Sequence, residues 1–200
     1  MKIKQRAKVL IGKYYAKKMH YDPKYLTGRW FTRENNYIGW NWVIKGGKDC
    51  KSKNVNMGCP FPISADSRVA GAKNIVFDPD DLNNFQHYGC YFQGKGKITI
   101  GKGTYIAPNV GIITANHDVN DLDKHDDAKP VTIGCNCWVG MNSVILPGVE
   151  LGPKTVVGAG AVVTKSFKEG YCVIAGNPAR KIKELEKDHE NYVNNQEVDC

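Results

Sequence analysis

Aliphatic side chains recur every six residues through the central part of the chain. They stand at Ile133, Val139, Ile145, Leu151, Val157 and Val163. Glycine follows most of them, and the fifth position of each hexad is small or β-branched. A period of six fits neither a helix, with about 3.6 residues per turn, nor the two-residue alternation of a strand. The repeating unit is therefore one short strand plus one turn, and such units bury their apolar positions only by stacking.

The same frame occurs upstream of this run. It includes Ile100, Ile106 and Ile112, and a looser set at Ile63, Val69 and Ile75, so the repeat covers much of residues 63–168. The next aliphatic after Ile112 is Ile133, 21 residues on instead of six, so about 15 residues leave the repeat as a polar, acidic loop. We place this loop at 113–132. Long excursions from a rigid scaffold are commonly functional.

The order aliphatic, Gly, two free positions, small, free resembles the hexapeptide-repeat acyltransferases. The segments APNVGIITANHD and VTIGCNCWVG on either side of the loop are similar to maltose- and galactoside-type O-acetyltransferases. This resemblance implies an all-β fold, a left-handed parallel β-helix with three hexads per coil, assembled as a homotrimer. We expect a basic helical and aromatic-rich region at 1–60, the β-helix at 61–176, and a C-terminal helix and tail at 177–200.

The resemblance also assigns a catalytic residue. In this family the histidine at the start of the loop is the general base, and His117 occupies that position. Imidazole suits the role because its pKa lies near working pH. Asp118 could orient the imidazole or cap a turn. We expect His125, which lacks the flanking motif, to be a solvated surface residue.

Two C-terminal stretches, GAGAVVTK and AGNPARKIK, resemble the donor-binding signature of the family. The resemblance carries contacts with acetyl-CoA, bound between subunits, onto Met141, Ala159, Thr164, Lys165, Arg180 and Lys183. The three cations among them could meet the nucleotide phosphates.

The acceptor side departs from the family pattern. An Ala-Asn-Phe segment of the related enzymes is replaced here by Tyr91-Phe92-Gln93-Gly94. Gln93 and Asn84 are the two candidates for a polar contact with the acceptor, and either could instead satisfy turn backbone.

These observations predict an O-acetyltransferase that moves an acetyl group from acetyl-CoA to a hydroxyl of a sugar or cell-surface glycan precursor, as in polysaccharide biosynthesis. Transfer to the amine of an amino sugar and a non-catalytic β-helix scaffold are the alternatives. No metal is expected to be required, because the histidines and seven cysteines show no metal-ligand spacing. The odd cysteine count and the absence of a signal-peptide pattern indicate a cytoplasmic protein.

The two ends of the chain differ from the repeat region in their charge pattern. Residues 1–53 hold 14 Lys and Arg against three acids. Within 2–19, Ile3, Ala7, Leu10 and Tyr14 share one face of a predicted basic helix, which could pack on its own domain or rest peripherally on the anionic inner membrane surface. No nucleic-acid motif is present. Charges alternate with apolar residues over 181–190, which favours a terminal helix covering the solenoid.

Overall fold

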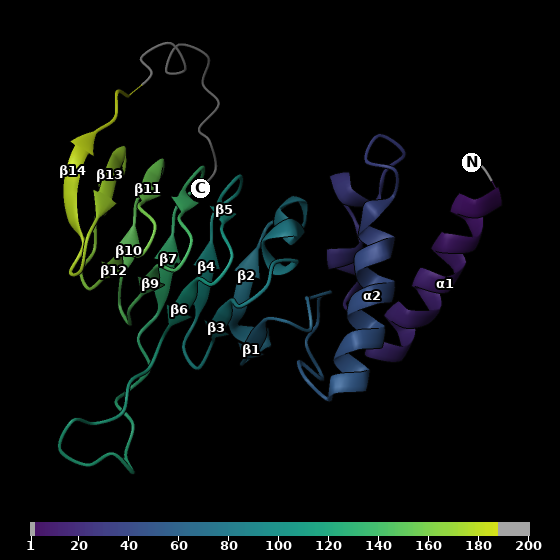
Figure 1. Cartoon of the computed structure of the whole chain (residues 1–200), viewed down its shortest axis with the longest axis horizontal. Coiled ribbons are helices and arrows are strands. Elements are labelled where there is room, and N and C mark those ends of the chain that lie inside the picture. Colours follow the sequence, from purple (N-terminus) through teal and green to yellow (C-terminus); the bar gives the residue numbers. More distant parts are fainter. Residues whose placement is uncertain (1–2, 188–200) are drawn as a thin grey trace.

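Two helices at one end of the molecule are followed by a stack of short strands (Figure 1). The computed structural model describes residues 3–187. The α-helices are α1 (Ile3–Met19) and α2 (Ile38–Lys53). Short 3-10 helices are η1 (Pro23–Leu26), η2 (Arg29–Phe31), η3 (Ala72–Asn74) and η4 (Pro79–Phe85).

The strands form three sheets. The first sheet contains, in spatial order, β1 (Arg68–Ala70), β3 (Tyr91–Gln93), β6 (Gly111–Ile113), β9 (Val144–Ile145) and β12 (Val162–Val163). The second contains β2 (Ile75–Phe77), β4 (Ile98–Ile100), β7 (Val131–Ile133) and β10 (Glu150–Leu151). The third contains β5 (Tyr105–Ile106), β8 (Trp138–Val139), β11 (Thr155–Val157), β13 (Cys172–Ala175) and β14 (Arg180–Glu184).

The chain visits the three sheets in turn, which makes the structure a three-sided solenoid of five coils. Coil 1 contains β1, β2 and η4; coil 2 contains β3, β4 and β5; coil 3 contains β6, β7 and β8; coil 4 contains β9, β10 and β11; coil 5 contains β12, a bridge at Phe167 and β13. All strand pairs between coils are parallel. The stacking expected from the repeat and the parallel solenoid implied by the family resemblance are therefore present, and the left-handedness stays an expectation from that resemblance.

The aliphatic position of each hexad stacks on its equivalent three hexads away. Ile133 of β7 pairs with Ile100 of β4 on one side and with Leu151 of β10 on the other. The three side chains are at most 2% exposed. Burying each such side chain contributes roughly 1.5–3 kcal/mol, so these columns form the core of the solenoid.

Glycines after the aliphatic position let successive coils approach backbone to backbone. A Cβ atom built on Gly152 would lie 2.1 Å from the Lys168 carbonyl oxygen and 2.5 Å from the Gly170 nitrogen. Any larger residue there would separate coils 4 and 5.

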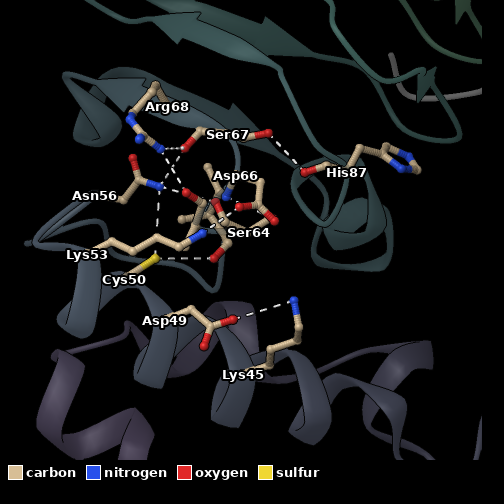
Figure 2. Close-up of polar contacts among 12 residues, drawn as sticks. Lys45, Asp49, Cys50, Lys53, Asn56, Ser64, Asp66, Ser67, Arg68 and His87 are labelled. Carbon is tan, nitrogen blue, oxygen red and sulfur yellow. Dashed lines mark hydrogen bonds and ion pairs between the residues drawn. The ribbon is translucent and has the colours of Figure 1, made fainter.

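Polar contacts tie α2 and the segment after it to coil 1 (Figure 2). The Asn56 amide donates to the carbonyl oxygens of Ser64 and Ser67, at 3.3 and 3.0 Å, while its oxygen accepts from the Val69 nitrogen at 3.0 Å. Lys53, the last residue of α2, pairs with Asp66 at 2.6 Å. The helical pair is thus fixed to the solenoid.

The structure corrects the fold prediction at both ends. The fold is not all-β, because α1 and α2 form the N-terminal region. The predicted C-terminal helix is wrong over residues 180–184, where β14 pairs antiparallel with β13. β13 is the last strand of the coils in the third sheet, and its open edge offers hydrogen bonds that outweigh a weak helical pattern. Residues 188–200 of that prediction lie outside the described residues.

We predict that Gly152→Ala lowers the free energy of unfolding by about 3 kcal/mol, because the added methyl meets backbone that cannot rotate away. Gly111→Ala is the matched control, since its Cβ would lie 3.6 Å from the Val144 side chain, an ordinary contact. The control should change stability by less than about 1 kcal/mol. Denaturant unfolding followed by circular dichroism measures both, and equal effects would contradict the close approach of the coils.

Candidate active site

The loop between β6 and β7 projects from the solenoid (Figure 1). Gln93, at the end of β3, fixes the base of this loop. Its side-chain oxygen accepts hydrogen bonds from the backbone nitrogens of Thr114, at 3.1 Å, and Ala115, at 2.9 Å. The Thr114 hydroxyl donates in turn to the Gln93 carbonyl oxygen. Gln93 therefore anchors the segment that leads to His117.

His117 and His125 face each other across the loop. Their backbones form an antiparallel bridge and their ring centroids are 4.1 Å apart. Both residues are exposed. The sequence pattern missed this contact, because nothing in the spacing of the two histidines indicates that the loop folds back on itself.

One hydrogen bond of the His117 ring fixes its tautomer. Its Nδ1 lies 2.7 Å from the carbonyl oxygen of Leu122. A carbonyl oxygen can only accept, so Nδ1 carries the proton and Nε2 of the neutral ring keeps a free lone pair. This is the arrangement that a general base needs. No sequence signal could have found Leu122, since any residue supplies a carbonyl.

Asp118 caps a turn. Its carboxylate accepts from the backbone nitrogens of Asn120, at 2.7 Å, and Asp121, at 3.1 Å. Among the described residues, the Leu122 carbonyl and not Asp118 orients the imidazole. Of the two roles that the sequence left open for Asp118, the structure shows the turn cap.

Lys95 sets the electrostatics of the pair. Its charge, followed by partial desolvation and by His117, lowers the pKa of His125 below the usual 6.5. The nearby positive charge of Lys95 thus disfavours the charged form of His125.

Asn84, the other acceptor candidate, is buried in η4 at 1% exposure. Its amide nitrogen donates to the Thr104 carbonyl oxygen at 2.8 Å, and its oxygen accepts from the Ile106 nitrogen at 2.9 Å. Both polar atoms are used by the backbone around β5. Asn84 supports the third sheet and presents no group to solvent.

The predicted donor residues lie in the turn before β9, in the turns on either side of β12, and in β14. Ala159 precedes β12, and the Met141 carbonyl accepts from the neighbouring Gly160 nitrogen at 2.8 Å, so Met141 and Ala159 stand on adjacent coils. Thr164 and Lys165 follow β12 and are exposed.

Arg180 and Lys183 are exposed on β14. The Ala179 nitrogen donates to the Val162 carbonyl oxygen at 2.8 Å, which places the start of β14 beside β12. Lys183 is the partner of Val173 in β13. Lys165 lines a cavity of about 500 Å³ that also contains Tyr171 and Lys187.

Thr164 and the base of the His117 loop lie at the same corner of the solenoid. Thr114 directly follows β6, and Thr164 directly follows β12, two strands further along the first sheet. With strands about 4.8 Å apart, the two corners are separated by roughly 10 Å. Thr164 and Lys165 therefore lie at the same corner as the base of the loop.

Stacked hexads and a loop that carries His117 are the features that the resemblance to hexapeptide-repeat acyltransferases led us to expect. The sequence profile of the bacterial transferase hexapeptide (six repeats) matches residues 130–165. The resemblance to hexapeptide-repeat acyltransferases is confirmed by the similar proteins.

Among curated proteins, the chain is 36% identical over 107 residues to a candidate acetyltransferase of Schizosaccharomyces pombe, covering 52% of this chain and 51% of that protein. It is 33% identical over 138 residues to a candidate acetyltransferase of Staphylococcus aureus strain Mu50, covering 68% and 64%. The chain spans about half to two thirds of the length of these relatives. Among solved structures, a maltose O-acetyltransferase from Clostridium difficile 630 is 33% identical, with a TM-score of 0.53 over 62% of this chain and 66% of that one.

Within residues 3–187, no group of three or more His, Cys, Asp or Glu side chains is arranged to hold a metal ion. Among the same residues, no helix has both the length and the apolar character needed to cross a lipid bilayer.

We predict that Lys95→Gln raises the pKa of His125 toward 6.5, because it removes the largest cause of the lowering. A histidine whose pKa is lowered on folding binds fewer protons in the folded state than in the unfolded state. The loop conformation in which His125 contacts His117 therefore loses stability as the pH falls below about 6.5. NMR titration of the imidazole protons measures both effects. Lys97→Gln, a change at an exposed neighbour on the same turn, is the control and should leave the pKa unchanged.

Proposed function

We propose that the protein is an O-acetyltransferase that uses acetyl-CoA and a sugar or glycan hydroxyl, with His117 as general base. The observation that carries this proposal is the His117 ring on an exposed loop, with Nδ1 held by the Leu122 carbonyl and Nε2 free. The names of the similar proteins support acetyl transfer, and that of the C. difficile enzyme supports a sugar acceptor.

The reaction follows from this tautomer. Nε2 of His117 takes the proton of the acceptor hydroxyl while its oxygen attacks the carbonyl carbon of the thioester. The tetrahedral intermediate collapses with cleavage of the carbon–sulfur bond, and the leaving thiolate takes the proton from the imidazolium. An acetyl ester and CoA are the products. The Leu122 carbonyl keeps its hydrogen bond to Nδ1–H throughout and stabilises the charged ring.

The donor would lie along the edge formed by the turns around β12. Lys165, Arg180 and Lys183 are exposed cations near this edge, and no described residue forms an ion pair with them. They suit the phosphates of CoA. We propose that a homotrimer completes the site, with the donor in the groove between neighbouring subunits, and that no metal takes part.

We predict that His117→Ala lowers turnover by about 100-fold or more, the usual contribution of a positioned base. The assay is CoA thiol release from acetyl-CoA with a panel of sugars, amino sugars and lipid-linked glycans. His20→Ala, at an exposed histidine just after α1, is the matched control and should retain activity. Unchanged turnover in His117→Ala would remove His117 from the mechanism, and a preference for amino sugars would identify the acceptor as an amine.

We predict that Lys165→Gln raises the KM for acetyl-CoA about tenfold with little change in kcat, because one charge-assisted contact to phosphate is lost. Lys168→Gln is the control. Lys168 is an exposed lysine in the same turn region, paired with Glu150 at 2.8 Å. Equal KM values for the two variants would place the donor elsewhere.

A further inference from the structure

Helix α1 packs on α2 through a narrow face of small residues. Gly12, Ala16 and Met19 are its buried residues. The Trp40 ring covers Gly12 so closely that a Cβ there would lie 2.4 Å from a ring carbon. Side chains larger than glycine cannot fit at this point, so the face of α1 that meets α2 is fixed.

The opposite face of α1 is apolar and open. Ile3 is 86% exposed, Leu10 68% and Tyr14 59%. Residues at these spacings lie along one side of a helix, and Ala7, also exposed, lies between them. In Figure 1, α2 lies between α1 and the solenoid, so this stripe is the outer surface of that end of the molecule.

Cations border the apolar stripe on both sides. At 100° per residue, Arg6, Lys13 and Lys17 fall along one edge, and Lys4 and Lys18 along the other. All five are exposed. Helix α1 contains no acidic residue, and in the described part of the chain none of these cations forms an ion pair.

We propose that α1 binds the surface of an anionic lipid membrane, lying in the interface with Ile3, Leu10 and Tyr14 among the lipids. A central apolar strip flanked by Lys and Arg fits this environment, because the aliphatics reach the acyl boundary while the cations stay among the headgroups. Tyr14 matches the interfacial level, since its ring is apolar and its hydroxyl polar. The Lys18 ammonium lies 5.4 Å from the Tyr14 ring centroid, so a cation borders this aromatic residue directly.

The charges on this face favour a membrane over the other possible binding partners, a second copy of the chain or a nucleic acid. A second copy of the chain would bring the same unpaired cations against one another, which is unfavourable in a two-fold contact. A nucleic acid would satisfy the cations but leave the exposed aliphatics in water. Residues 1–53 hold 14 Lys and Arg against three acids, so the field around this end favours an anionic surface. The proposal does not depend on the acyl transfer argued above.

The test is flotation of the full chain with vesicles of phosphatidylcholine and phosphatidylglycerol in equal parts, compared with phosphatidylcholine alone. We expect binding to the anionic vesicles that is lost at about 1 M salt, where charges are screened within about 3 Å. Arg6→Gln with Lys13→Gln and Lys17→Gln should weaken partitioning roughly 100-fold, about fivefold for each cation. Leu10→Ser with Tyr14→Ser should weaken it at least tenfold at unchanged charge.

Val76→Ser with Ile182→Ser is the matched control, because both residues are exposed apolar side chains of the solenoid. This control should bind the vesicles as the wild type does. Binding that is equal for all the variants, equal on neutral vesicles, or absent for the wild type overturns the proposal. If the Leu10 and Tyr14 variant instead changes the oligomeric state measured by light scattering, and vesicle binding is unchanged, the face is a contact between copies of the chain.

Discussion

The candidate active site depends on the in-register stacking of one coil on the next. Main-chain hydrogen bonds join each strand to the strand above it, and the aliphatic of each hexad closes the interior, as Ile133 does between Ile100 and Leu151. Glycines at the corners allow the coils to meet at backbone distance. This regular frame lets one corner carry both the loop that begins at Thr114 and the donor-side turn at Thr164.

The sequence predicted the parts of the fold that depend on local repetition. The hexad frame predicted stacked strand-and-turn units, the family resemblance predicted that their strands are parallel, and the slip between Ile112 and Ile133 predicted the loop. Prediction failed where non-local pairing decides the structure. Residues 180–184 have a weakly helical pattern, yet they form β14 because β13 offers an open edge.

The same distinction holds for the candidate site. His117 was proposed from its register and flanking motif, but its orientation comes from the carbonyl of Leu122, which carries no sequence signal. His125 looked like an ordinary surface residue, and only the fold of the loop brings its ring to His117. At the N-terminus, the apolar stripe of α1 was visible in the sequence. That it faces outward is decided by the fit of Trp40 on Gly12.

The number of coils also sets the distance between the loop and the outer face of α1. The loop leaves coil 3, so α2 and two further coils lie between it and the outer face of α1. Helices pack about 9 Å apart and strands about 4.8 Å apart, which puts the loop roughly 30 Å above that face. One coil is three hexads, so inserting or deleting a coil would change this height in steps of about 4.8 Å. The number of coils thus sets the distance between the outer face of α1 and the loop, independently of the chemistry in the loop.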